Sequence, residues 1–414
     1  MANKPFDFGA LLGENNRRPD YRLKTDEGSF VRAAVNADLT PQSTFKRRKG
    51  SALSVAGTDC HSLWSSGTDS YFADYDTLYH LSSAMVKTAV SAQVVPGQQV
   101  SFADANGVVY CSTGAELFRL SGSSAAVKAG IVPPNVSPTL TAAAGGSLPA
   151  GIYQATISFV APSGEESGAL KPVSVTVPEN GALTISGIQV SAVYSTAVYL
   201  SPPNGDVLFR IAKTTNAALP AITIQPQSNA SRARTILLSR MPPGQIVRCS
   251  DVDGRLVVAS GNILYYSELF APTLHNPAKS YIPFSGNITM VRPCVDGMFV
   301  SADQTYWLAG DMATASIAPI LPYKAVFGTD SKVPNSNSVW WMSERGMVVG
   351  SPGGQVENVQ EKFVAVDAAA AGASLYREQD GMRQMLSSLF GMQTNAMAAS
   401  SYMEFEVIRK ETEL

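Results

Sequence analysis

The sequence predicts an all-β protein with a β-propeller body, an inserted β-sandwich and an extended N-terminal arm. Three observations predict this architecture: short alternating strands in the middle of the chain, hairpins that recur through the rest of it, and a concentration of charge at its start. A chain of 414 residues is about three times as long as a common domain, so more than one folded unit is expected.

Charge is scarce in this chain and unevenly placed. Charged residues make up 15% of it, against roughly 25% in an ordinary soluble domain, and the net charge is −2. Residues 1–50 carry ten Lys or Arg and six Asp or Glu, whereas residues 132–230 carry only seven charges. This composition excludes intrinsic disorder of the highly charged kind. The chain shows neither an apolar run long enough to span a membrane nor the apolar core of a secretory signal, so we expect a protein made in the cytoplasm.

Residues 132–230 predict an immunoglobulin-like or fibronectin type III β-sandwich. Turn residues interrupt short alternating runs every eight to twelve positions, and about seven short strands in fewer than 100 residues is typical of this fold. The turn Gly164–Glu166 is expected to be solvated rather than a point of contact. The expected strands and hairpin turn include Ala155–Phe159, Val173–Val177, Leu183–Ile188 and Pro202–Asp206.

A weak internal repeat in the remaining chain predicts propeller blades. Each copy has an Asp, Asn or Arg before a turn glycine, a strand rich in Val, a polar turn and an apolar or aromatic strand. Hairpins that recur every 40 to 50 residues fit four-stranded blades, which bury their faces only against neighbouring blades. The clear copies are residues 103–122, 251–269, 295–311 and 343–360, and residues 68–83 and 376–390 resemble them.

We therefore predict about six blades, formed by residues 51–131 and 231–414, with residues 132–230 inserted after the second blade. The alternative for the body is a large irregular all-β fold. Residues 363–390 are rich in helix formers, so a helix is the alternative to strands there.

Known motifs give no catalytic, cofactor-binding or metal site, and we expect the protein not to be an enzyme. The chain lacks a nucleophile elbow, a phosphate-binding loop and a dinucleotide fingerprint. Its cysteines occur singly, as expected of buried thiols rather than ligands or redox pairs. They are Cys60, Cys111, Cys249 and Cys294.

Three further patterns have both a structural and a functional interpretation. Ser301–Trp307 is faintly similar to the Asp-box of sialidase-type propellers, which is a structural turn in those enzymes. Asp251–Gly254 could begin a Ca²⁺ loop, but the later oxygen ligands do not follow, which favours a blade turn. Trp307, Trp340 and Trp341 could stack on carbohydrate, although buried blade aromatics are the more common case.

The basic residues of the arm are the best functional signal. They could contact DNA phosphates, or they could pair with acidic groups on a neighbouring subunit. The candidate residues are Arg17, Arg18, Arg22, Lys46, Arg47, Arg48 and Lys49.

The arm also resembles the opening of propeller-containing phage tail proteins, in which A-x-N-x-x-[IL] precedes [KR]-R-x-G. Residues 148–168 resemble part of the fibronectin-like modules inserted in phage virion proteins. Together with the late element of residues 375–389, these segments make the chain similar in organisation to nozzle or tubular tail proteins of short-tailed bacteriophages. The matching arm residues are Ala34, Asn36, Leu39, Arg47, Arg48 and Gly50.

The resemblance implies a virion structural protein of the phage tail. It implies a homo-oligomeric ring, often sixfold, around the DNA exit channel and attached to the portal, the adaptor and other tail proteins. DNA would pass through the lumen without sequence specificity, and no cofactor or membrane span is needed. Residues 1–50 would clasp a neighbour or the adaptor, so deletion of residues 1–45 should abolish assembly and leave the propeller folded. A carbohydrate- or receptor-binding propeller is the alternative, and a glycosidase is a distant third.

Overall fold

The computed structural model describes residues 9–50, 52–105, 107–233, 238–244, 246–249, 254–334, 336–364, 369–379, 382–390 and 403–408. The all-β prediction is confirmed. Within these residues the helical segments are two short 3-10 turns, η1 (Asp20–Arg22) and η2 (Pro352–Gly354). No helix in the described part of the chain is long and apolar enough to cross a membrane.

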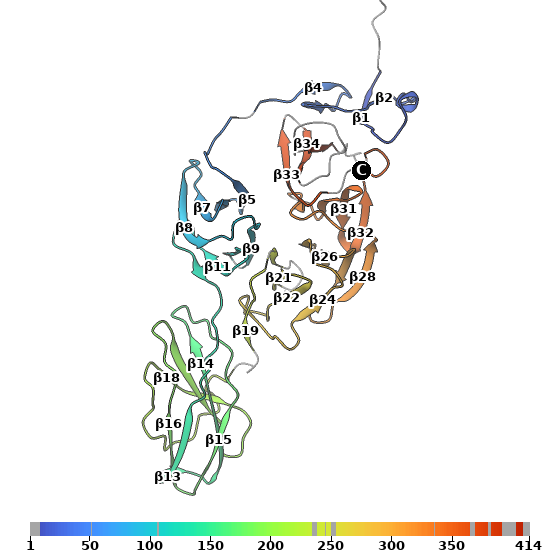
Figure 1. The fold of residues 1–414 in the computed structure, drawn as a ribbon. Helices are drawn as coiled ribbons and strands as arrows, with labels where there is room; N and C mark the ends of the chain where they lie inside the picture. The colour runs from blue at the N-terminus through green and yellow to red at the C-terminus, as the bar shows by residue number, and fades with distance from the viewer. Residues whose placement is uncertain are drawn as a thin grey trace, which may run out of the picture.

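Six antiparallel sheets of the described residues follow one another along the chain and around an arc (Figure 1). Each of the first five has four strands, which pair in the order in which the chain forms them. The first sheet holds β5 (Cys60–Ser65), β6 (Ser70–Asp74), β7 (Thr77–Leu81) and β8 (Lys87–Gln93), and the second holds β9 (Ser101–Ala105), β10 (Val108–Ser112), β11 (Leu117–Leu120) and β12 (Val127–Lys128).

The other four sheets come after the inserted segment, and the last of them has three strands. The third holds β20 (Ile246–Cys249), β21 (Leu256–Ser260), β22 (Ile263–Tyr266) and β24 (Tyr281–Pro283), and the fourth holds β25 (Met290–Pro293), β26 (Gly297–Ser301), β27 (Thr305–Ala309) and β28 (Ser316–Leu321). The fifth holds β29 (Ser331–Lys332), β30 (Val339–Ser343), β31 (Gly346–Ser351) and β32 (Gln355–Asn358), and the sixth holds β33 (Ala371–Gln379), β34 (Met382–Phe390) and β35 (Met403–Ile408).

Consecutive sheets pack face to face and share an apolar core. Five clusters of buried side chains in the described residues each join one sheet to the next. Alternate residues of a strand therefore enter different clusters, because successive side chains point to opposite faces. Cys111 packs between the first two sheets and Tyr110 between the second and third. Trp341 and Trp340 likewise pack on opposite faces of the fifth sheet. Burial on both faces explains why these strands read as continuous apolar runs.

The first strands of neighbouring sheets lie side by side. Strand β20 contacts both β9 and β25, and β29 contacts β33. The early and late parts of the arc also approach each other. A Cβ atom on Gly328 would lie 2.9 Å from Nε2 of Gln99 and 2.5 Å from the carbonyl oxygen of Gly372. Gln99 precedes the second sheet and Gly372 belongs to the sixth, so these two sheets come close at this point.

The sequence repeat locates hairpins correctly but misses their position within a sheet. Gly107 and Gly297 follow the first strand of their sheets, whereas Gly346 follows the second strand and begins the third. The helix alternative for residues 363–390 is wrong, because β33 and β34 pair along their whole length. Burial of Met385 and Leu389 against the fifth sheet outweighs the helix propensity of the segment.

The inserted segment contains two sheets around one apolar core. Strand β13 (Thr139–Leu148) pairs with β16 (Gly181–Ser186), and the second sheet has the order β15 (Val173–Val177), β14 (Gly151–Val160), β17 (Ser195–Leu200), β18 (Phe209–Thr214). Tyr153, Ile157, Leu183 and Val198 are among the core residues. The segment leaves the body after β12 and returns near β19 (Ser239–Arg240), which pairs with β23 (Leu274–His275) (Figure 1). The immunoglobulin or fibronectin type stays a prediction.

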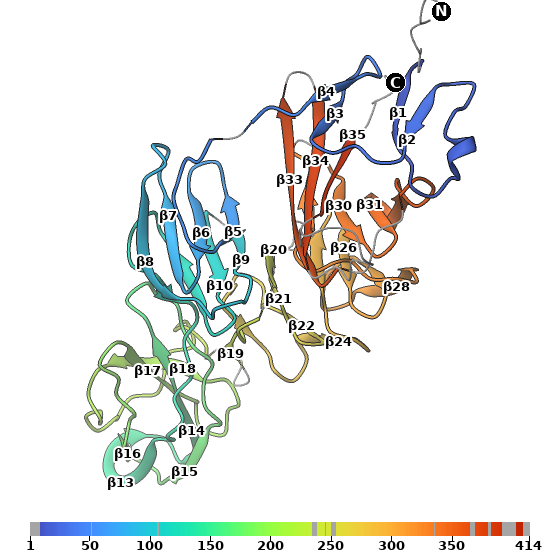
Figure 2. The same ribbon diagram turned by 45° about the horizontal axis from the view of Figure 1, so that its top comes forward.

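The N-terminal arm carries two small sheets of its own. Strand β1 (Leu11–Glu14) pairs in parallel with β2 (Ser29–Val31), and β3 (Ala37–Leu39) pairs antiparallel with β4 (Phe45–Arg47). The arm lies beside the sixth sheet at one end of the arc, and the chain then crosses to β5 at the other end (Figure 2). It is therefore a folded element rather than a simple extended strand.

Candidate functional site

The arm is anchored on the segment that follows the fifth sheet. The backbone N–H of Asn16 donates to the carbonyl oxygen of Phe363 at 3.1 Å, and Nε of Arg17 donates to that of Val364 at 3.2 Å. The rings of Phe30 and Phe363 stack with their centroids 5.6 Å apart. These contacts join residues that are more than 300 positions apart in the chain, so they fix the arm on its own body.

A second anchor is the carboxylate of Asp38, which is only 6% exposed. One of its oxygens lies 2.9 Å from Nε of Arg48, and the other lies 3.4 Å from a terminal nitrogen of Arg377 in β33. Arg48, one of the predicted basic residues, thus takes part in an internal ion pair. Nearby, burial raises the pKa of Glu14, and the N–H of Ala34 donated to that carboxylate partly offsets the shift.

Residues 17–25 of the arm form a basic hollow, with a volume of about 540 Å³. The fully buried Asn15 precedes the hollow and fixes the backbone at its start, because its Oδ1 accepts the N–H groups of Arg17 and Arg18 at 3.1 and 2.9 Å. The 3-10 turn η1 then reverses the chain. The hollow is lined by Arg17, Arg18, Pro19, Tyr21, Arg22, Lys24 and Thr25, so four cations and no acidic side chain contribute to it.

Interactions with the protein position the three arginines of the hollow. The guanidinium of Arg18 lies over the ring of Phe30, 5.4 Å from its centroid, and that of Arg22 lies 5.6 Å from the centroid of Tyr21. The acidic residue within this stretch, Asp20, pairs instead with Arg32. Among the described residues none of the four cations lining the hollow forms an ion pair. The hollow is therefore positively charged and suited to anions.

The structure separates the predicted basic residues into two groups. Arg17, Arg18 and Arg22 meet in the hollow, whereas the run from Lys46 to Lys49 lies on and after β4. Lys46 and Arg47 are exposed, and they pair in register with Asp38 and Ala37 of β3. Sequence reasoning missed Lys24 and Tyr21 as members of the hollow. A signal was present, since both lie within three residues of Arg22.

Gly164 of the turn Gly164–Glu166 is exposed as expected, but Glu165 and Glu166 are partly buried, and Glu165 ties the insert to the body. Glu165 accepts a hydrogen bond from the hydroxyl of Thr273, and its other oxygen lies 4.0 Å from a terminal nitrogen of Arg119 in β11. Glu166 accepts from the buried hydroxyls of Ser158, at 2.5 Å, and Tyr199. Burial, with the neighbouring carboxylate, raises the pKa of Tyr199 well above its usual range. The solvated-turn prediction is wrong for the two glutamates, because the buried hydroxyls of Ser158, Tyr199 and Thr273 have these carboxylates as acceptors.

Glu166→Ala is expected to lower the opening free energy of β14 and β17 by about 2 kcal/mol, because it leaves two buried hydroxyls without their acceptor. Hydrogen exchange of peptides covering these strands measures the change. Glu166→Gln is the matched control, since it keeps an acceptor oxygen, and it should retain most of the protection. Equal protection of β14 and β17 from exchange in Glu166→Ala and Glu166→Gln would show that the Glu166 carboxylate does not stabilise these strands.

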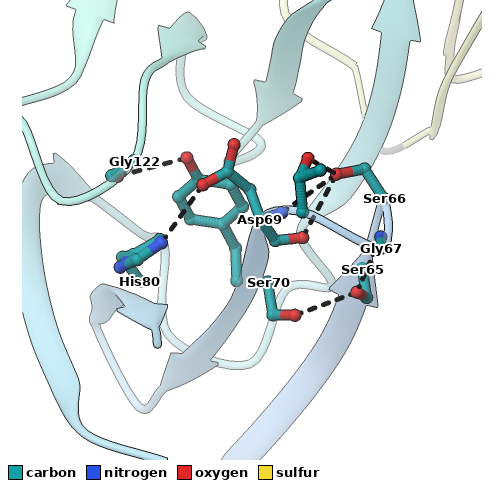
Figure 3. A network of polar contacts seen from close by, with 9 residues as sticks. Ser65, Ser66, Gly67, Asp69, Ser70, His80 and Gly122 are labelled. Atoms are coloured by element: carbon teal, nitrogen blue, oxygen red, sulfur yellow. Dashed lines mark hydrogen bonds and ion pairs between the residues drawn. The ribbon is translucent and has the colours of Figure 1, made fainter. Parts of the chain in front are cut away.

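Figure 3 shows a polar network at the β5–β6 turn that contains Asp69, His80 and several serines. Oδ1 of Asp69 lies 3.2 Å from Nε2 of His80. The hydroxyl of Ser70 donates to that of Ser65 at 2.9 Å, and Ser66 accepts the backbone N–H of Asp69 at 3.1 Å. In the described residues no serine hydroxyl is hydrogen-bonded to the His80 ring, so these groups do not form the Ser-His-Asp relay of acyl transfer. They hold the turn.

The Asp-box-like segment and the tryptophans have structural roles. Oγ of Ser301 accepts the N–H of Ala325 at 2.7 Å, and Thr305 donates to the carbonyl oxygen of Tyr323 at 2.9 Å, so the turn ties the fourth sheet to the chain leading to the fifth. Trp307, Trp340 and Trp341 are buried, which leaves their faces inaccessible to a sugar. Asp251, Val252 and Asp253 of the Ca²⁺-loop pattern lie outside the described residues.

Two of the predicted buried thiols, Cys111 and Cys294, are confirmed as buried, and burial raises the pKa of Cys111 to about 12. The prediction is wrong for Cys60, which is exposed because it begins the edge strand β5. The side chain of Cys249 lies outside the described part. No group of three or more His, Cys, Asp or Glu side chains suited to a metal ion occurs among the described residues.

No protein-family model matches the chain, and no curated protein matches it. Among solved structures, BBS1N in complex with ARL6DN matches with a TM-score of 0.34 and 11% identity, over 87% of this chain and 96% of that one. KlHsv2 with a replaced loop matches with a TM-score of 0.30 and 9% identity, over 85% and 98%. AztD from Citrobacter koseri matches with a TM-score of 0.25 and 8% identity, over 74% and 88%. These scores are too low to support an assignment, and none of the three proteins is described as a phage tail protein.

Proposed function

We propose that the chain is a ring-forming structural subunit of the tail of a short-tailed phage, with a β-propeller body of six blades and a fibronectin-like insert. Three features of the body support the propeller: sheets that follow one another in the chain, apolar cores shared by consecutive sheets, and neighbouring first strands. The approach of Gln99 to Gly328 supports closure of the arc.

The observation that carries the proposal is the division of charge between arm and body. Residues 1–50 are net positive, and in the structure the acidic Asp38 and Asp20 are engaged within the arm and its anchor. Lys46, Arg47 and the basic hollow remain on the surface. A basic arm fixed to a body with few charges suits a subunit that joins acidic partners and surrounds DNA.

Exposed apolar side chains on the body also support assembly. Phe270 is 97% exposed and has a φ of 59°, a left-handed conformation that is uncommon for a bulky residue. Leu269 beside it is exposed as well. Side chains of this kind are typical of surfaces that a neighbouring subunit covers. On this proposal the neighbours are copies of the chain, the portal, the adaptor and other proteins of the virion tail.

One observation favours a second candidate, a carbohydrate- or receptor-binding propeller. An apolar hollow of about 350 Å³ lies at the outer strands of the third and fourth sheets, where Phe284 and Tyr306 contact each other with centroids 5.2 Å apart. Tyr306 also donates its hydroxyl to Asp303 at 3.0 Å. Phe284 is buried, so the partly exposed ring of Tyr306 next to this carboxylate is the surface available to a sugar.

The two functions are tested by measuring the mass of the purified protein with mass photometry and its binding on a glycan array. The tail-ring proposal predicts a closed oligomer of more than two chains, alone or with its portal and adaptor, and no glycan binding. A monomer that binds a glycan, and loses that binding in Tyr306→Ala, would favour the second candidate.

A further inference from the structure

We infer that the basic hollow of residues 17–25 binds the phosphodiester backbone of DNA without sequence specificity. The inference deepens the proposed function and rests on it for the identity of the polymer. Four cations line the hollow and no acidic side chain does. Phosphate neutralisation by Lys and Arg supplies most of the sequence-independent affinity for DNA.

The arginines of the hollow are held ready for an oxyanion. Nε of Arg17 is bonded to the carbonyl oxygen of Val364, and in the described residues its two terminal nitrogens have no other partner. Arg18 lies over the ring of Phe30, which is itself stacked on Phe363. Guanidinium groups that are already oriented can bond a phosphate through two N–H groups while losing little side-chain entropy.

The wall of the hollow adds one feature that suits a nucleic acid. Tyr21 is 79% exposed and lies next to the Arg22 guanidinium, so its ring can pack on a sugar or a base edge.

An acidic protein segment would satisfy the charge of the hollow but would not need its other features. Arginine forks fit carboxylate and phosphate alike, so the feature that separates the two ligands is the exposed Tyr21 ring, which can stack on a base. DNA therefore accounts for more of the hollow than a carboxylate-rich peptide does.

The test uses the full-length protein and a labelled 30-base-pair DNA of arbitrary sequence, with anisotropy titrations between 50 and 200 mM NaCl. The triple variant Arg17→Gln, Arg22→Gln, Lys24→Gln is compared with a control that removes the same charge from exposed lysines outside the arm, Lys171→Gln, Lys213→Gln, Lys279→Gln. We expect the hollow variant to bind at least tenfold more weakly at 50 mM NaCl, and its salt slope to fall by about 3, roughly one for each lost phosphate contact. The control should stay within about twofold of the wild type.

Hollow and control variants of equal affinity and equal salt slope would overturn the inference. So would a hollow variant that loses binding to polyglutamate but keeps its binding to DNA. Circular dichroism and the assembly mass of each variant are measured on the same samples. A hollow variant that still forms rings but no longer binds DNA supports DNA binding by the hollow. Wild-type protein that stays monomeric but binds DNA through these residues would contradict the proposed ring and leave the DNA-binding inference standing.

Discussion

Replacing Trp341 with alanine is expected to lower the free energy of unfolding by about 4 kcal/mol, a typical loss when a large aromatic side chain in a core is truncated to alanine. Trp341 is fully buried between the fourth and fifth sheets, and its ring centroid lies 5.4 Å from that of Phe299. A Cβ atom on Gly350 would lie 2.8 Å from the Trp341 ring, so the neighbouring strand approaches it closely. Removal of the ring leaves a cavity that these packed strands cannot close.

Trp341→Phe is the control for this prediction, and urea unfolding measures both variants. Nε1 of Trp341 is buried and has no hydrogen-bond partner in the described residues. Phenylalanine therefore loses volume but no hydrogen bond, and it should cost about 2 kcal/mol or less. A loss below about 1 kcal/mol for the alanine variant would mean that consecutive sheets do not share this core.

Asp38→Ala is expected to detach the arm, with a cost of about 3 kcal/mol to local opening, because two arginines lose the carboxylate that they share. Both arginine side chains are partly exposed, which places the cost at the lower end of the range for buried ion pairs. Limited proteolysis and hydrogen exchange over residues 9–50 measure the release.

Asp26→Ala is the matched control for Asp38→Ala, since it removes the same charge from an exposed position of the same arm. It should leave proteolysis unchanged, and equal release in both variants would refute the anchor. The contacts of Asn16, Phe30 and Asp38 with the body also change the expectation for the truncation of residues 1–45. That deletion removes packing from the sixth sheet in addition to any contact with a neighbour, so point variants separate the two effects more cleanly.

Local patterns in the sequence were sufficient to predict the strands and hairpins but not their place in the sheets. Strands with apolar residues on both faces and turn glycines such as Gly107 and Gly297 mark hairpins directly. Whether a hairpin is formed by the first and second strands or by the second and third depends on two-residue strands such as β29, which leave no sequence signature. The helix-forming composition of residues 363–390 was misleading because tertiary burial of Met385 and Leu389 decides that segment.

The candidate site could be predicted only in part, because its geometry depends on distant residues. The clustering of Arg17, Arg18 and Arg22 is visible in the sequence as a basic run. Their orientation depends on Phe363 and Val364, which no local pattern connects to the arm. The partners of Glu165 were not predictable for the same reason, since Arg119 lies in the second sheet and Thr273 immediately before β23.

We propose that this chain assembles as a ring around a DNA channel. Electron microscopy of the protein purified together with its portal and adaptor tests this proposal most directly. We expect closed rings around an open channel, with the propeller bodies side by side, the inserts outside and the arm of residues 9–50 at the boundary between subunits or facing the adaptor. Single arcs that stay separate in the presence of both partners would contradict it.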